Sequence, residues 1–100
     1  MAVITNPEWL RKPNGDDYVS YYPQRAMDLG KPGSATIKCS VRANGTLENC
    51  VVTSEDPPGF DFGAATLRIS KLWKMKPKTA DGQAVEGAEV TIPLRWQLAG

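Results

Sequence analysis

The sequence lacks histidine and contains only two cysteines among its 100 residues. Histidine is the usual general base of enzymes and a common metal ligand, so its absence removes the commonest route to acid–base catalysis. Cys39 and Cys50 are too few for a zinc site, and they lack the Cys-x-x-Cys spacing of thiol redox enzymes. Two pairs of adjacent carboxylates, at 16–17 and 55–56, lie in expected turns, where solvation explains them. We therefore expect no enzymatic activity, no metal site and no cofactor.

The sequence also lacks an excess of charge of one sign and a long apolar run. Its 12 basic and 11 acidic residues are interleaved and give a net charge of +1. Nucleic-acid ligands usually select a clustered basic face, so we expect no nucleic acid partner. No apolar run approaches the roughly 18 residues that a membrane helix needs, and the N-terminus lacks the apolar region of a secretory signal. The length, without an internal repeat, predicts one domain.

The most informative segment is a predicted β-hairpin over residues 36–55, TIKCSVRANGTLENCVVTSE. Apolar and polar residues roughly alternate on either side of Asn44-Gly45, a dipeptide that favours a two-residue type I′ turn. Such a turn places Cys39 opposite Cys50, about 5 Å apart at Cα and within reach of a disulfide. An even number of cysteines at cross-strand spacing favours this disulfide.

The register of the hairpin has an alternative. A three-residue loop with a G1 bulge pairs Val41 with Leu47, but it places the two sulfurs on opposite faces and forbids the bond. A second bulge near Glu48-Asn49 would allow both the Val41–Leu47 pairing and the disulfide. The alternative is that both cysteines are reduced, in which case no second bulge is needed. A disulfide would indicate an oxidising compartment, in which case we expect that an export segment preceded Met1 and was removed.

The other residues predict two helices and a final strand. The first helix begins at Tyr22-Pro23 and ends at Gly30, because proline suits the first helical position and glycine the C-terminal cap. The second helix has Asp61 as its N-cap and runs to Pro77, with an apolar stripe at helical spacing. The stripe comprises Phe62, Ala65, Ile69, Leu72 and Trp73.

Residues 88–98 alternate between apolar and polar side chains and predict a half-buried strand. Pro93 lies in its middle, and a proline cannot donate to a β-ladder. We therefore expect an edge strand whose position 93 faces away from its partner. An open edge suits the docking of an extended peptide, although an edge merely blunted by proline and charge is the alternative. The predicted apolar face comprises Val90, Ile92, Leu94, Trp96 and Leu98.

Together these elements predict an α+β fold, a three-stranded antiparallel sheet with two helices packed on one face, in the order helix-strand-strand-helix-strand. Residues 1–20 are expected to form an irregular arm, either ordered against the sheet through Trp9 or simply the end of a spacer, and residues 21–100 to form the domain. Pro7, Pro13 and Asn14-Gly15 indicate the irregular conformation of the arm.

Four segments, in this order, carry a family resemblance: YYPQRAMDLG, the Asn-Gly hairpin, GFDFGAATLRISKLWKMKP and VTIPLRW. Over about Tyr21 to Leu98 the chain resembles the C-terminal domain of TonB proteins. The paired cysteines are a departure, since the hairpin of the best-known members lacks them. The resemblance implies a periplasmic domain of an energy transducer that is anchored in the inner membrane of Gram-negative bacteria.

The resemblance also implies the partners. Members bind the TonB box of outer-membrane transporters by strand addition. They transmit energy from the inner-membrane proton-motive complex, through their N-terminal segment, for uptake of solutes such as siderophores. Carried onto this sequence, binding falls on the last strand and on the segment before the first helix, where the family often has a glutamine in place of Tyr21. The candidate binding residues are Val90, Thr91, Ile92, Pro93, Leu94, Arg95 and Trp96, with Tyr21, Tyr22 and Pro23.

Two other classes of protein fit the same residues. One is a TonB-like envelope module of a sensory or structural membrane protein that binds peptidoglycan or another protein. The other is a cytosolic adaptor with both thiols reduced. The open edge also offers a route to a homodimer by strand exchange.

Overall fold

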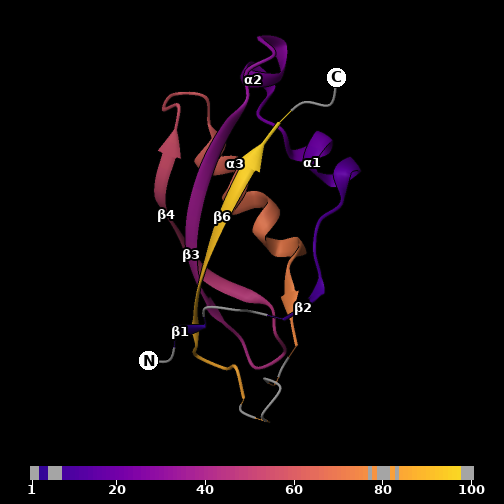
Figure 1. The fold of residues 1–100 in the computed structure, drawn as a ribbon, viewed down its shortest axis with the longest axis vertical. Coiled ribbons are helices and arrows are strands. Elements are labelled where there is room, and N and C mark those ends of the chain that lie inside the picture. Colours follow the sequence, from indigo (N-terminus) through magenta and orange to yellow (C-terminus); the bar gives the residue numbers. More distant parts are fainter. Residues whose placement is uncertain (1–2, 5–7, 77, 79–81, 83, 98–100) are drawn as a thin grey trace.

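The computed structural model describes residues 3–4, 8–76, 78, 82 and 84–97. A four-stranded sheet, with strand order β1-β6-β3-β4, organises the molecule, which measures 46 × 24 × 17 Å (Figure 1). Strands β6, β3 and β4 pair antiparallel, as the sequence predicts, and the short strand β1 adds a parallel pairing at one end of β6. The strands are β1 (Val3–Ile4), β3 (Gly33–Val41), β4 (Leu47–Asp56) and β6 (Glu89–Trp96).

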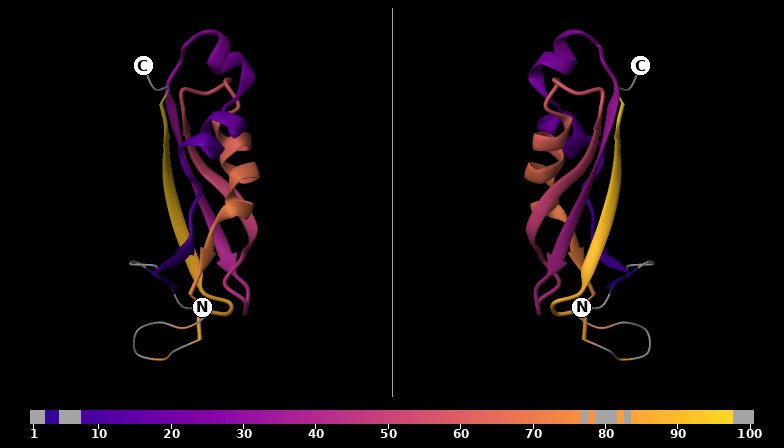
Figure 2. Two further views of the ribbon diagram at one scale, coloured as in Figure 1. Left: turned by 90° about the vertical axis from the view of Figure 1, so that its right-hand side faces the viewer. Right: turned by 90° about the vertical axis from the view of Figure 1, so that its left-hand side faces the viewer.

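Helix α3 (Phe62–Ile69) packs against one face of this sheet, and no described element covers the opposite face (Figure 2). Helix α1 (Gly15–Tyr21) contacts α3, and helix α2 (Gln24–Asp28) lies at one end of the molecule (Figure 1). The predicted α+β class, with its three antiparallel strands and helices, is therefore confirmed.

The prediction of an irregular arm over residues 1–20 is wrong. The segment contains β1, most of α1 and strand β2 (Trp9–Arg11), which pairs antiparallel with β5 (Lys74–Met75). Helix α1 starts with a capping box, in which the backbone N–H of Asn14 donates to Asp17 Oδ2 and that of Asp17 donates to Asn14 Oδ1, both at 2.9 Å. Asn14 thus serves as a helix cap and not as a turn residue.

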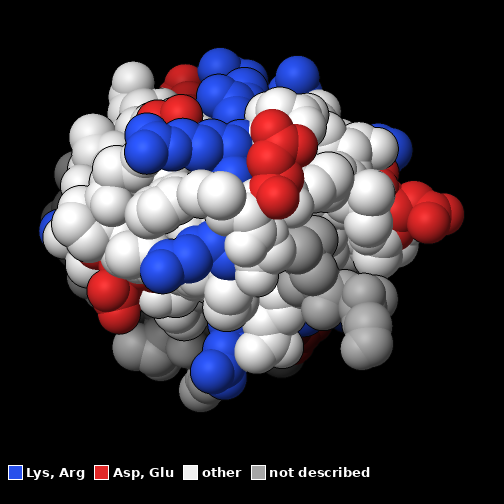
Figure 3. Space-filling view, turned by 90° about the horizontal axis from the view of Figure 1, so that it is seen from above, with Lys and Arg blue, Asp and Glu red and all other residues white. Residues whose placement is uncertain are grey.

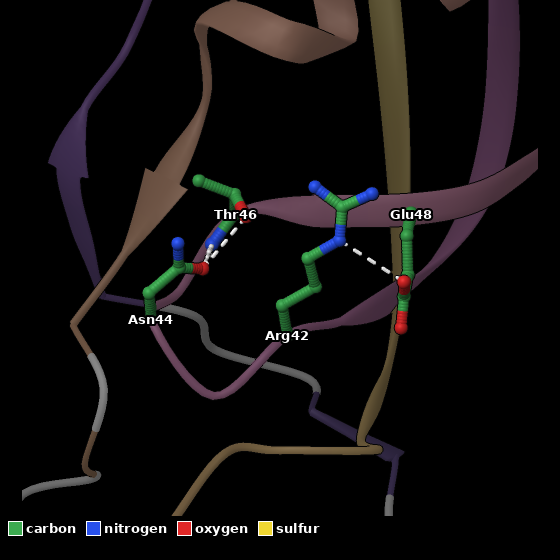
Figure 4. A network of polar contacts seen from close by, with 4 residues as sticks. All are labelled: Arg42, Asn44, Thr46 and Glu48. Carbon is green, nitrogen blue, oxygen red and sulfur yellow. Dashed lines mark hydrogen bonds and ion pairs between the residues drawn. The ribbon is translucent and has the colours of Figure 1, made fainter.

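The tip of the hairpin is a three-residue loop and not the predicted type I′ turn. The Gly45 N–H donates to Arg42 O and the Arg42 N–H donates to Thr46 O, each at 2.8 Å. Only Gly45 has a positive φ in this turn, of 90°. Asn44 instead uses its side-chain oxygen to accept from the Thr46 N–H and hydroxyl, at 3.0 and 2.7 Å, while Arg42 pairs with Glu48 across the ladder (Figure 4). These contacts favour the bulged turn.

A bulge in β4 reconciles the two registers of the hairpin. Near the turn Val41 pairs with Leu47, and the register then shifts so that two residues, Asn49 and Cys50, lie opposite the single Cys39. Asn49 absorbs the shift with a φ of 53°. Cys39 and Cys50 form a disulfide with their Cα atoms 4.1 Å apart. The combination of a G1 bulge with a second bulge near residues 48–49 is therefore confirmed, and the reading with two reduced cysteines is wrong.

The second predicted helix is shorter than expected. It ends at Ile69 and continues as a 3-10 turn (Ser70–Leu72), because the chain then extends into β5 to pair with β2. Pro77, the predicted stop, lies outside the described residues. Asp61 occupies the N-cap position without a side-chain hydrogen bond, and the Gly63 N–H donates instead to Glu55 Oε2, at 2.8 Å. Strand β4 thus caps α3, which fixes the helix on the sheet.

The predicted alternation of the last strand is confirmed over the described residues. The apolar side chains of β6 are buried, while Thr91, Pro93 and Arg95 are exposed, and Leu98 lies outside the described residues. Glycine closes α2 as predicted, because Gly30 has a φ of 64° and its N–H donates to Met27 O. The largest fully buried side chains are Trp96, Phe62, Ile37, Ile69, Met75, Val41, Val85, Val90, Thr66 and Cys39.

Replacing both cysteines by alanine should lower the free energy of unfolding by about 2–3 kcal/mol, because the disulfide restricts the unfolded chain. Urea unfolding followed by circular dichroism measures this loss, and wild type treated with a reducing agent is the matched control, with the same bond opened. Equal unfolding midpoints for wild type, variant and reduced protein would contradict the expected stabilisation.

Candidate functional site

The candidate site is the open edge of β6. This strand pairs with β3 from Ser40–Glu89 to Gly33–Trp96, but on its other side β1 reaches only Glu89 and Val90. From Thr91 onward no described strand lies beside that edge. Among the described residues, the backbone of β6 is therefore paired on one side along its length and unpaired on the other over most of it.

Pro93 faces this open edge. It lies opposite Thr36 of β3, and the Thr36 carbonyl accepts a hydrogen bond from Thr53 Oγ1 of β4, at 3.2 Å. The Thr36 carbonyl thus points away from β6, which makes Thr36 and Pro93 a non-hydrogen-bonded pair. Because backbone groups alternate in direction along a strand, Thr91 and Arg95 also direct theirs to the open edge. The missing N–H of Pro93 therefore costs the sheet no hydrogen bond.

The side chains of β6 anchor this strand in the core. Trp96 is fully buried, its indole N–H donates to Thr66 Oγ1 at 3.0 Å, and its ring meets those of Tyr18 and Tyr22 edge-on, with centroids 5.4 and 5.7 Å apart. Edge-on contacts between aromatic rings add about 0.5–1.5 kcal/mol of stability each, beyond the stabilisation from the apolar area that they bury. Burial also raises the pKa of the Tyr18 and Tyr22 phenols.

The predicted binding residues Tyr21, Tyr22 and Pro23 lie between the end of α1 and the start of α2, and they are not among the residues that line the groove beside Thr91 to Leu94. Tyr22 and Pro23 are buried, and the Tyr22 hydroxyl donates to Lys31 O. Tyr21 is half-buried, with the ammonium of Lys71 5.5 Å from its ring centre. Tyr22 packs edge-on against Trp96 in the core, and none of the three residues lines the groove beside β6.

A groove with a volume of about 370 Å³ runs beside the open edge of β6. One wall is Thr91 to Leu94, and the opposite wall comes largely from the N-terminal arm. Trp9 packs edge-on against Trp73, with ring centres 6.3 Å apart. The sequence left open that Trp9 orders the arm against the sheet, but it did not indicate this groove; the capping box at Asn14 is a further signal for an ordered segment. The other lining residues are Lys12, Tyr18 and Trp73.

The described surface away from the groove carries scattered charged side chains (Figure 3). At the end of the molecule near α2, Arg25 and Lys31 both lie over the ring of Phe60, 5.3 and 5.5 Å from its centre. Figure 3 shows basic and acidic side chains interspersed with uncharged surface in this view. Within the described part of the chain, no cluster of His, Cys, Asp or Glu could hold a metal ion, and no helix is long and apolar enough to cross a membrane.

The chain is similar to known proteins in sequence and in fold. The family model of the Gram-negative bacterial TonB protein C-terminal matches residues 19–98. An uncharacterized protein of Caulobacter vibrioides is 28% identical over 81 residues, 75% of this chain and 81% of the relative. The solution NMR structure of the Pseudomonas aeruginosa TonB CTD has a TM-score of 0.69 at 15% identity, over 97% of this chain and 91% of that one. The TonB2 protein of Vibrio anguillarum has a TM-score of 0.62 at 22% identity, over 100% and 91%.

Thr66→Val should lower the free energy of unfolding by about 1–3 kcal/mol, because it leaves the buried indole N–H of Trp96 without an acceptor. Thr53→Val is the matched control, since it removes a hydroxyl that bonds at an exposed position, and it should change stability by less than about 0.5 kcal/mol. Urea unfolding compares the two variants. A loss at Thr66 no larger than that at Thr53 would contradict the anchoring role of this contact.

Proposed function

Because the family model matches 19–98, the chain belongs to the family of Gram-negative bacterial TonB C-terminal domains, and we propose that it binds the TonB box of outer-membrane transporters by strand addition to β6. Domains of this family are periplasmic, are not enzymes and interact with outer-membrane transporters. The proposal assigns that interaction to one edge of this sheet.

The observation that carries the proposal is the outward-facing backbone row of β6, interrupted only at Pro93. An extended peptide laid beside Thr91 to Trp96 would gain backbone hydrogen bonds of about 1 kcal/mol net each, with side-chain pockets adding specificity. A free strand edge is a liability that proteins usually cover or blunt. In this chain the described strand β1 covers one end of the edge as far as Val90, and no other described strand pairs with the remainder.

The other edge of the sheet is a poorer docking surface. Strand β4 has two register shifts, one where Asn49 and Cys50 oppose Cys39 and one between Thr36 and Ile37 of its partner. Each bulge interrupts the regular alternation of outward donors and acceptors and twists the strand. Strand β6 pairs with β3 without a shift over eight residues, so its outward row has the regular spacing that a docked strand needs.

The proposal extends to energy transduction. In the full-length protein an N-terminal segment would anchor the domain in the inner membrane and connect it with the proton-motive complex, for the uptake of solutes such as siderophores. Tension would then pass through this domain to the docked box. A set of backbone hydrogen bonds loaded together suits this task, because separating the strands requires breaking several of them at once.

Arg95→Pro should weaken the binding of TonB-box peptides at least about tenfold, because it removes an outward N–H and places a proline ring at the edge. Arg95→Ala is the matched control, since it removes the side chain and keeps the N–H, and it should retain most of the affinity. Titrations of the labelled domain followed by NMR measure both affinities, and they should show shifts along residues 88–97 in wild type.

Stability separates loss of binding from loss of fold. The N–H of Arg95 faces away from β3, so Arg95→Pro should unfold at nearly the wild-type urea concentration. Equal peptide affinities for Arg95→Pro and Arg95→Ala would contradict docking on this edge. Silence of wild type across a panel of boxes would favour an envelope module, and shifts that depend on protein concentration alone would favour a homodimer.

A further inference from the structure

We propose that the groove between β6 and the N-terminal arm is a side-chain pocket that selects a large apolar residue of the docked strand, and that Lys12 favours a carboxylate next to it. This inference rests on strand addition to β6. It assigns specificity to Trp9, Lys12 and Tyr18, which precede residue 19 and so lie outside the segment that the family model matches.

The lining of the groove carries the apolar half of the proposal. Three aromatic residues from separate segments face the edge: Trp9 of β2, Tyr18 of α1 and Trp73 after the 3-10 turn. Trp9 and Trp73 hold each other edge-on, and Tyr18 is held in the same way by Trp96. A volume of about 370 Å³ lies near the lower end of ligand pockets, a size that suits one or two side chains. Rigid aromatic walls of this kind favour an apolar occupant.

The two faces of the edge differ in chemistry. On the uncovered face of the sheet, a second hollow of about 360 Å³ is lined by Ser34, Thr36, Pro93 and Arg95, among others. Successive side chains of an added strand point to opposite faces. One set would therefore meet the aromatic wall and the other set a polar surface beside Arg95, which predicts a partner with alternating apolar and polar residues.

Lys12 carries the charged half of the proposal. Its side chain is exposed and lines the groove, and it forms no ion pair within the described part of the chain. Two acids lie four residues from it in the sequence: Glu8 is held by Lys76 at 2.9 Å, and Asp16 forms no ion pair within the described part of the chain. A carboxylate of the docked strand would thus find an ammonium group with no competing partner, although solvent limits such exposed pairs to a small contribution.

The test uses synthetic peptides derived from one TonB box that binds wild type. One pair differs by leucine or alanine at the position expected to face the groove, and a second pair differs by aspartate or asparagine beside it. Wild type should prefer leucine about tenfold or more. Trp9→Leu should reduce that preference severalfold, and Lys12→Gln should weaken the aspartate peptide about two- to fivefold while leaving the asparagine peptide unchanged.

Two neighbouring residues of β2 provide matched controls. Leu10→Ala truncates an exposed side chain, 56% accessible, and Arg11→Gln removes one positive charge from the same segment outside the groove. Each of these two variants should keep the preference for the leucine peptide and the preference for the aspartate peptide. If Lys12→Gln and Arg11→Gln weaken binding of the aspartate peptide equally, the effect comes from the overall charge of the domain, and the assignment of Lys12 is overturned.

The outcomes separate the pocket from the docking edge. Peptide binding that is lost in Arg95→Pro but shows the same leucine preference in wild type and Trp9→Leu would retain strand addition and overturn the pocket. If no TonB box in the panel binds wild type, strand addition and the pocket are both overturned. Changes in the groove that follow the concentration of wild-type protein without peptide would assign the groove to a second copy of the chain and overturn the proposal.

Discussion

Among the described strands, β3 alone pairs with β6 along its whole length, so β6 depends on its side chains for much of its stability. Its four core-facing apolar side chains, Val90, Ile92, Leu94 and Trp96, are buried, and full burial of such a side chain contributes about 1.5–3 kcal/mol. Trp96 adds an indole hydrogen bond to Thr66 inside the core. This anchoring lets the strand keep a free backbone edge without separating from the sheet, and the proposed docking function depends on that freedom.

The N-terminal arm follows from the same constraint. An unprotected edge invites pairing with other chains, and this chain limits the exposure with Pro93 and with the short strand β1. The arm then leaves β6, pairs with β5 and packs Tyr18 against Trp96 before it reaches the rest of the domain. The groove lies between the part of the edge that β1 leaves uncovered and the aromatic residues of the arm.

Local patterns predicted much of this arrangement. The alternation around Pro93 indicated an edge strand. The Val41–Leu47 pairing and the disulfide can both form only if the hairpin contains a second bulge, and β4 contains one. Asn44 and Gly45 are common in two kinds of turn, so their identity did not decide the loop. The local pattern of the arm could not decide between order and irregularity, because β2 is held by β5, a partner distant in sequence. The groove depends on that packing, and no local pattern could have located its walls.

Amide hydrogen exchange of β6, with and without a TonB-box peptide, tests the central claim most directly. In the free domain the amide of Arg95 should exchange quickly, while those of Ile92 and Leu94, which face β3, should exchange slowly. Bound peptide should slow the exchange of Arg95 at least about fivefold, since a hydrogen bond of about 1 kcal/mol or more then has to open. Protection of Arg95 in the free monomer, or an unchanged rate with saturating peptide, would contradict the open docking edge.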